Sequence, residues 1–127
     1  MRLTIHTLTQ IPEQHKAHVD LILHSTPDIQ LPEQACFYLA TFNDKAVALA
    51  WRQDDRLGYV AVRDLTRRRG IGRELLRHIK EDAKHSGLTR LRLDPAQASP
   101  ANRPGLLAFL QEQGFTGTEH LLSYSVY

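Results

Sequence analysis

Residues 57–76 read LGYVAVRDLTRRRGIGRELL, and this stretch decides the fold. Its first part, Leu57 to Leu65, carries apolar, aromatic and β-branched residues and predicts a strand. Its last part opens a helix, because apolar residues recur at helical spacing from Gly72 onward. These apolar residues are Leu75, Leu76, Ile79 and Ala83. The stretch therefore predicts a strand, a tight loop and an amphipathic helix in direct succession.

The loop between this strand and this helix has the character of an anion site. The first turn of a helix leaves backbone N–H groups without intrahelical partners, and these groups can surround a phosphate. Gly70 and Gly72 allow a phosphate to approach the backbone and permit turn angles that other residues avoid. A hydroxyl and several guanidinium groups supply further donors. The residues expected around the anion are Thr66, Arg67, Arg68, Arg69, Gly70, Ile71, Gly72 and Arg73.

The positive charge of the chain is concentrated around this loop. The net charge is +2, but residues 63–77 hold six arginines against Asp64 and Glu74, a local charge of +4. A nucleic-acid-binding protein usually spreads basic charge along a face that follows the phosphate backbone. An arginine-rich recognition helix starting at Arg63 would also sacrifice its apolar core face. Nucleic acid is therefore not expected as a partner, and a compact polyanion such as a nucleotide cofactor is favoured.

The rest of the chain supplies further strands and helices in a mixed order. With 127 residues, 42% of them hydrophobic, residues 1–127 are expected to form one globular domain. The expected fold class is α/β (α+β) with a mixed sheet. The expected strands are 2–8, 36–42, 45–52, 57–65, 88–93 and a closing pair within 115–127. The expected helices are one of about a dozen residues after Pro12, one from Gly72 to about His85 and one around 106–113.

Several other functions find no support in the residue pattern. No stretch approaches the length of apolar chain that spans a bilayer, and the N-terminus lacks a continuous apolar region, so we expect a cytoplasmic protein without a membrane segment. Cys36 is the one cysteine and is expected in the core. His15, His18 and His24 fall near one helical face, but no carboxylate or cysteine accompanies them at the spacing of a metal site. No metal is therefore expected.

Two motifs resemble the Gcn5-related N-acetyltransferase (GNAT) superfamily. Arg-x-x-Gly-x-Gly between a strand and a helix is its acetyl-CoA signature, and residues 67–72 match it. The segment 106–115, LLAFLQEQGF, resembles its second conserved stretch, a helix ending in Gly-Phe. The resemblance implies acetyl-CoA or CoA as cofactor, and a GNAT fold with a mixed central sheet of about six to seven strands, a splayed strand pair and about four helices. It also implies that the pantetheine arm bonds to the backbones of Val60, Ala61 and Val62.

The acid and base groups that acetyl transfer usually needs are missing from their expected positions. Many GNAT enzymes carry a glutamate on the strand before the loop, but residues 57–65 contain none. They also carry a tyrosine four residues before the glycine of Gly-Phe, where this chain has Leu110. Tyr124 and Tyr127 could substitute, although tyrosines on a closing strand are more often packing residues. No catalytic residue is assigned, and a non-catalytic or weakly active regulator is expected.

Within this superfamily the chain resembles the PanM/PanZ family. The likeness is carried by residues 62–72 (VRDLTRRRGIG), the opening Leu3-Thr4-Ile5, the Phe42-Asn43 turn and residues 108–115. Members of that family are bacterial maturation and regulatory factors of aspartate 1-decarboxylase. This pyruvoyl enzyme makes β-alanine for pantothenate and hence for CoA.

The resemblance implies a partner and a signalling role for the cofactor. In the family, the acetyl-CoA complex binds the decarboxylase zymogen, promotes the self-cleavage that creates the pyruvoyl group, and restrains the mature enzyme. Such coupling requires that the partner bind the liganded and empty proteins with different affinities. Arg67 and Arg68 are expected at the rim of the cofactor, where they could touch both ligand and partner. The alternative is an ordinary acetyltransferase that acts on a small-molecule or protein amine.

Overall fold

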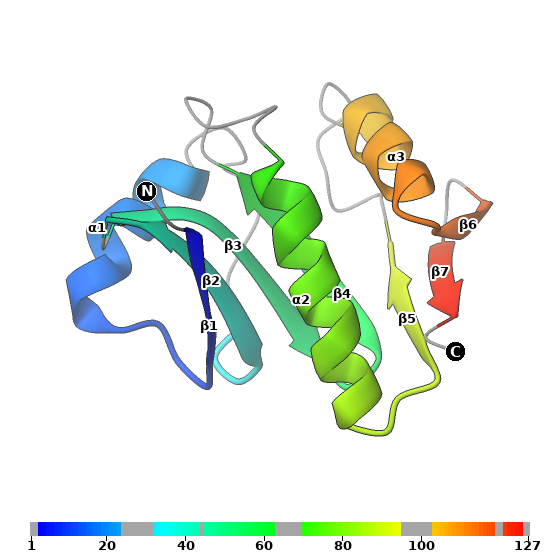
Figure 1. The fold of residues 1–127 in the computed structure, drawn as a ribbon, viewed down its shortest axis with the longest axis horizontal. Helices are drawn as coiled ribbons and strands as arrows, with labels where there is room; N and C mark the ends of the chain where they lie inside the picture. Colours follow the sequence, from blue (N-terminus) through cyan, green and yellow to red (C-terminus); the bar gives the residue numbers. More distant parts are fainter. Residues whose placement is uncertain are drawn as a thin grey trace.

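A computed structural model describes residues 3–23, 32–43, 45–62, 70–94, 103–118 and 121–125. Its centre is a seven-stranded sheet in the order β1-β2-β3-β4-β5-β7-β6 (Figure 1). Neighbouring strands are antiparallel except β4 and β5, which run parallel, so the sheet is mixed as expected. The strands are β1 Leu3–Leu8, β2 Cys36–Phe42, β3 Lys45–Gln53, β4 Arg56–Val62, β5 Arg90–Leu93, β6 Thr116–Thr118 and β7 Leu121–Ser125.

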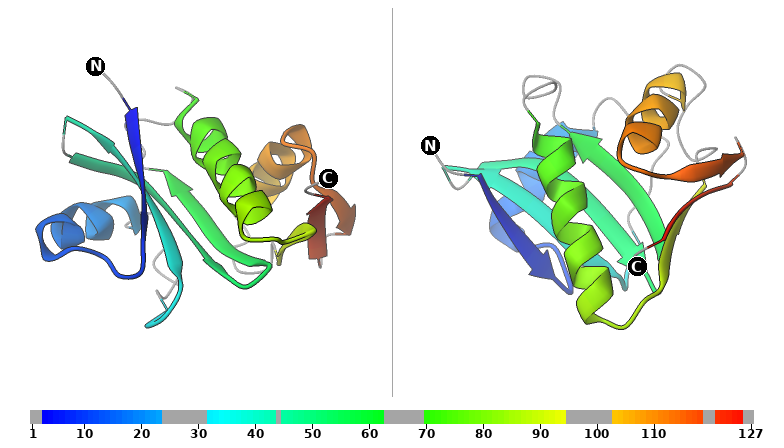
Figure 2. Two further views of the ribbon diagram at one scale, coloured as in Figure 1. Left: turned by 60° about the horizontal axis from the view of Figure 1, so that its bottom comes forward. Right: turned by 45° about the vertical axis from the view of Figure 1, so that its right-hand side comes forward.

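Helices cover both faces of the sheet. The helical elements are the 3-10 turn η1 (Glu13–His15) and the α-helices α1 (Lys16–Ile22), α2 (Ile71–His85) and α3 (Arg103–Glu112). Figure 2 shows α2 and α3 on one face and α1 on the opposite face. Three α-helices and one short 3-10 turn thus stand, in the described ranges, where about four helices were expected. None of these helices is long and apolar enough to cross a membrane.

The two predicted hairpins are confirmed. Phe42 pairs with Lys45 across the first turn, and Gln53 pairs with Arg56 across the second. In the first turn Asn43 has a φ of 50°, and in the second Asp54 has a φ of 53°. Asn and Asp tolerate this left-handed conformation better than most residues, which explains why these short polar pairs form tight turns.

A β-bulge in β4 depends on one glycine. Ala50 pairs with Val60 and Arg52 with Leu57, so Gly58 and Tyr59 together lie opposite Trp51 alone. A Cβ placed on Gly58 would lie 1.9 Å from Nε1 of Trp51, a distance that no packing can accommodate. The indole is only 4% exposed, so it has little freedom to move aside. Gly58 therefore allows Trp51 to pack flat against β4.

The ends of α2 and α3 follow the glycine signals in the sequence. Gly87 (φ 81°) comes after α2, and the amide of Leu88 donates to the carbonyl of Ala83 at 3.0 Å. Gly114 (φ 94°) comes after α3, and the amide of Phe115 donates to the carbonyl of Leu110 at 3.0 Å. Left-handed glycines with such hydrogen bonds are a common way to terminate a helix. Both predicted helix ends are confirmed.

Candidate cofactor site

The strands β4 and β5 meet at one end and diverge at the other. Within the described residues their recorded pairing is confined to Arg56 with Arg92. The amide of Arg92 donates to the carbonyl of Asp55 at 2.8 Å, at the same end. From Leu57 to Val62, β4 keeps its pairing with β3 but has no recorded strand partner on its β5 side. This is the splayed pair that the resemblance implies, and it leaves a backbone edge of β4 free for a ligand.

The helix α2 begins beyond the far end of β4. Gly70 precedes it with a φ of 78°, a conformation that glycine adopts without strain. A Cβ on Gly70 would meet nothing within 4 Å, so the space beside this residue is open. The following amides, of Ile71, Gly72 and Arg73, belong to the first helical turn, where N–H groups lack partners within the helix. Helix polarity adds a partial positive charge here, so the geometry suits an anion.

The predicted site residues fall into two groups. On β4, Val60 and Ala61 are buried in the sheet, and Val62 is the last residue of the strand. At the start of α2, Ile71 is buried in the core while Gly72 is half-buried and Arg73 is exposed. Backbone groups that could bind a ligand are thus found both along β4 and in the first turn of α2, the next described element in the sequence. The remaining predicted residues, Thr66, Arg67, Arg68 and Arg69, lie outside the described residues.

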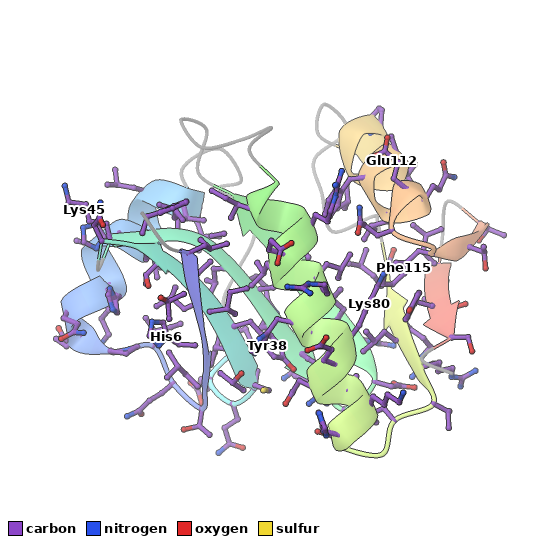
Figure 3. The ribbon with its side chains drawn as sticks, viewed as in Figure 1. His6, Tyr38, Lys45, Lys80, Glu112 and Phe115 are labelled. Carbon is purple, nitrogen blue, oxygen red and sulfur yellow. The ribbon has the colours of Figure 1, made fainter. Side chains whose placement is uncertain are left out.

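Leu110 and Tyr124 both make packing contacts. Leu110, at the position where many GNAT enzymes have tyrosine, is fully buried. The Tyr124 ring lies 5.5 Å from the Phe115 ring, and Lys80 Nζ lies 4.1 Å from its centroid. Figure 3 shows Lys80 on the side of α2 that faces Phe115. These contacts give Tyr124, a residue of β7, a packing role against Phe115 and Lys80 of α2. Tyr127 lies outside the described residues.

Lys80 also ties α2 to the end of α3. Its ammonium group donates to the carbonyl of Gln113 at 2.5 Å. Burial lowers the pKa of Lys80 from its ordinary value. Since Gln113 follows α3, the lysine satisfies one of the carbonyls that the end of a helix leaves without a partner.

A buried polar network under α2 was not predicted from the sequence. The Tyr38 hydroxyl donates to Asp82 Oδ2 at 2.6 Å, and Arg52 donates to both, through Nε at 3.0 Å and Nη2 at 3.2 Å. Burial, and then the hydrogen bond to Asp82, raise the pKa of Tyr38 well above its ordinary value. Cys36 is partly buried and packs against the apolar core, and its Sγ lies 4.0 Å from Asp82 Oδ2 at the margin of this network. The network joins β2, β3 and α2.

A second polar group lies where β4 and β5 meet. Arg92 Nη2 donates to Asp55 Oδ1 at 2.8 Å, and Arg90 Nε lies 3.5 Å from Asp55 Oδ2. The hydrogen bond from Arg92 lowers the pKa of the Asp55 carboxyl, and the nearby Arg90 lowers it further. The ion pairs of Arg90 and Arg92 with Asp55 had no signal in the sequence.

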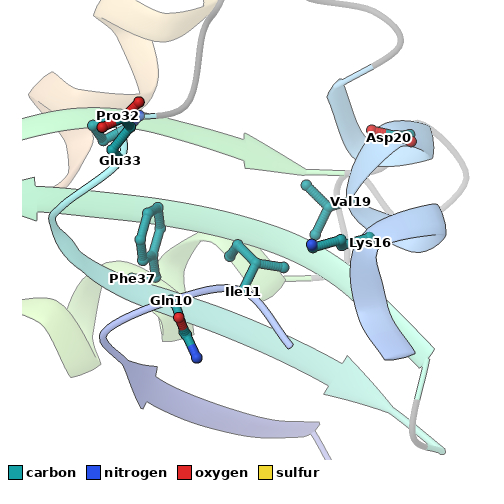
Figure 4. A pocket seen from close by; sticks show the side chains of 8 residues that line it. All are labelled: Gln10, Ile11, Lys16, Val19, Asp20, Pro32, Glu33 and Phe37. Atoms are coloured by element: carbon teal, nitrogen blue, oxygen red, sulfur yellow. The ribbon is translucent and has the colours of Figure 1, made fainter. Parts of the chain in front are cut away.

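The opposite face of the sheet carries a separate pocket of about 400 Å³ (Figure 4). Its floor is formed by the buried side chains of Val19 and Phe37. The full lining is Gln10, Ile11, Lys16, Val19, Asp20, Pro32, Glu33 and Phe37. It lies on the α1 side and does not include any predicted cofactor residue.

The histidines do not form a metal site in the described part of the chain. The His15 and His18 rings lie 6.2 Å apart, and His24 lies outside the described residues. No group of three or more potential metal ligands comes together among the residues that the structure describes.

The chain is similar to known proteins along most of its length. A family model described as "Acetyltransferase (GNAT) domain, PanZ" matches residues 2–123. The PanD regulatory factor of Escherichia coli K12 is 28% identical over an alignment of 125 residues that covers 94% of this chain and 95% of that protein.

Solved structures share the fold. The solution structure of a candidate N-acetyl transferase from E. coli, YhhK, bound to coenzyme A, has a TM-score of 0.77 and 26% identity, covering 98% of this chain and 99% of that one. A GNAT-family acetyltransferase from Elizabethkingia anophelis with acetyl-CoA bound has a TM-score of 0.65 and 20% identity, covering 97% of each chain. A candidate GNAT acetyltransferase from Desulfovibrio desulfuricans has a TM-score of 0.77 at 15% identity, covering 99% of this chain and 100% of that one.

Proposed function

The chain belongs to the PanZ family of GNAT acetyltransferase domains, and on this premise we propose that it binds CoA or acetyl-CoA and regulates aspartate 1-decarboxylase. The observation that carries the proposal is the convergence of two backbone features. The free edge of β4 leads toward the first turn of α2, where Gly70 has its left-handed conformation. A pantetheine arm along β4 would bring its pyrophosphate to that helix terminus. The E. coli protein of known structure that is 26% identical was solved with coenzyme A bound.

The cofactor acts as a signal in this proposal. The acetyl-CoA complex binds the decarboxylase zymogen in the cytoplasm and promotes the self-cleavage that forms its pyruvoyl group. Support comes from the 28% identical E. coli relative, which is named a PanD regulatory factor. It also comes from what the chain lacks for acetyl transfer, since β4 has no glutamate and Leu110 and Tyr124 are packed. Turnover on ordinary amines should therefore be slow, because loss of general acid and base help commonly costs about 10² to 10⁴-fold.

Cofactor binding is tested by calorimetry with CoA and acetyl-CoA. We expect a dissociation constant in the micromolar range or tighter for the wild type, and a loss of at least about 100-fold for Gly72→Trp, because a bulky side chain on the first turn blocks the phosphate. Ser86→Trp is the matched control, since it places the same side chain at the exposed far end of α2. Equal affinities for wild type and Gly72→Trp would show that the loop assignment is wrong.

The regulatory role is tested by mixing the protein with purified decarboxylase zymogen. Cleavage and complex formation should both increase when acetyl-CoA is added. Linkage requires that the zymogen tighten acetyl-CoA binding by the same factor. Equal recovery of the zymogen with and without acetyl-CoA would show that the cofactor is not the signal. Rapid acetylation of an amine panel would instead favour the acetyltransferase.

A further inference from the structure

The closed end of the β4–β5 pair is held by a hairpin turn that is fixed from two sides. This turn, Asp54-Asp55, connects β3 to β4. On one side Arg52 Nη1 donates to the carbonyl of Asp54 at 2.6 Å. On the other side Arg92 of β5 reaches Asp55 twice, through its backbone amide and through its guanidinium group. The turn therefore carries contacts from both sides of the point where the two strands diverge.

The contact with β5 is partly buried. The Asp55 side chain is 23% exposed and the Arg92 side chain 32% exposed. Arg92 Nε is buried and has no hydrogen-bond partner in the described part of the chain. Removal of the carboxylate would leave this partly buried guanidinium group without its charged partner, which costs free energy. Arg90 adds a more exposed and longer contact to the same carboxylate, at 3.5 Å.

The contact on the other side reaches α2. Arg52 binds the turn with one nitrogen and Asp82 of α2 with another, at 3.2 Å. The start of the same helix, from Gly70 to Arg73, is the proposed site of the pyrophosphate. The same turn thus contacts β5 directly and contacts α2 through Arg52.

We propose that Asp55 is a positioning residue of the cofactor site, whose ion pair with Arg92 sets the angle at which β5 diverges from β4 and so the affinity for the pantetheine arm. This inference rests on the proposed binding of CoA. The β4 strand extends about 20 Å from Arg56 to Val62, at about 3.3 Å per residue. At that distance from the closed end, a change of about 5° in the angle between β4 and the group of β5, β7 and β6 would alter their separation by nearly 2 Å, whereas a functional site must hold its groups within about 0.5 Å. The Lys80 contact with Gln113 joins α2 to the end of α3 and does not involve the ion pair, so it remains when the ion pair is lost.

The test compares two ligands on Asp55→Asn. CoA carries the pantetheine arm, whereas 3′-phosphoadenosine 5′-diphosphate keeps the pyrophosphate and lacks that arm. We expect Asp55→Asn to weaken CoA binding about five- to tenfold, a factor typical of the coupling between two sites in a protein. The affinity for the shorter ligand should change by less than about twofold. The control is Glu13→Gln, which removes the exposed 2.7 Å ion pair with Lys16 and should leave both affinities unchanged.

Three outcomes overturn the proposal, and each is distinct from a failure of the proposed function. Unchanged CoA affinity in Asp55→Asn shows that the ion pair does not set the angle. Equal weakening of both ligands shows that the residue only stabilises the fold. If Asp55→Asn does not fold, Arg92→Gln removes the charge from the other side of the ion pair, and unchanged CoA affinity in that variant is equally contrary. If the wild type itself fails to bind CoA, it is the proposed function that is wrong.

Discussion

The strands β1–β4 and the strands β5, β7 and β6 are built in different ways. The strands β2 and β3 have seven and nine residues, and nearly every residue in the middle of each is buried, because α1 covers one face and α2 the other. In contrast, β5 has four residues, β7 has one buried residue and all three residues of β6 are exposed. Apart from β1, in which no residue is buried, the first group has the packing of a rigid scaffold, whereas the second is a thin layer under α3. The candidate cofactor site lies where the two groups meet.

This difference indicates how stability and binding are divided in the molecule. Regions with many buried apolar contacts open only with the whole fold, whereas thinly packed regions open locally at lower cost. We therefore expect stability to depend mainly on β1–β4 and α2. The position of β5, β7 and β6 should depend on a few polar contacts that cross between the two groups, of which Asp55 with Arg92 and Lys80 with Gln113 are two.

The largest expected effect comes from truncating a buried leucine in each group. Leu49 of β3 and Leu122 of β7 are 0% and 1% exposed. Removal of a buried leucine side chain costs about 2–5 kcal/mol of unfolding free energy, and the cost depends on how well the surroundings collapse. We expect Leu49→Ala near the upper end and Leu122→Ala near the lower end, because β7 lies in the thin layer. Urea unfolding measures both, and equal losses would contradict the division into a rigid and a thin group.

The next effect tests the network inside the rigid group. Tyr38→Phe removes a hydroxyl that bonds to both Asp82 and Arg52, so we expect a loss of about 1–3 kcal/mol of unfolding free energy. The pKa of Tyr38 is raised in the folded protein, so the folded state holds the hydroxyl proton more tightly than the unfolded state does. The resulting contribution to the free energy of unfolding is fully present below about pH 10 and is lost as the pH rises above that value.

The measurement for this prediction is urea unfolding of wild type and Tyr38→Phe between pH 8 and about pH 11. The wild type should lose more stability than Tyr38→Phe over this interval, so the two curves should converge as the pH rises. Parallel curves would show that Tyr38 does not hold its proton more tightly in the folded state.

The smallest effect tests a contact between the two groups. Lys80→Met keeps the aliphatic stem but removes the hydrogen bond to Gln113 and the charge over Tyr124, and should cost about 1 kcal/mol. Lys45→Met is the control, because Lys45 is exposed at the start of β3 and should change stability by less than about 0.5 kcal/mol. Thermal unfolding of both variants is the measurement. A larger loss from Lys45→Met would show that Lys80 does not link the groups.

Local order was readable from the sequence because it depends on near neighbours. The strand and helix within residues 57–76 follow from periodicity, and the turns at Asn43 and Asp54 follow from residues that tolerate left-handed angles. The ends of α2 and α3 follow from Gly87 and Gly114 for the same reason. The segment after Pro12, expected as one helix of about a dozen residues, is instead divided into the 3-10 turn η1 and α1, which ends at Ile22. The splayed strands and the cofactor came from a family resemblance, which periodicity could not supply.

Only the tertiary structure decided which polar side chains meet. Tyr38 and Asp82 are 44 residues apart in sequence, and Asp55 and Arg92 are 37 apart. Each was an ordinary turn, strand or helix residue when taken alone, because a side-chain hydrogen bond has no periodicity and leaves no trace in composition. The need for glycine at position 58 likewise arises from Trp51 on the neighbouring strand. Sequence determined the helices and strands and predicted a loop for a phosphate, whereas packing determined the angle at which the two groups of strands meet, since that angle depends on contacts between distant residues.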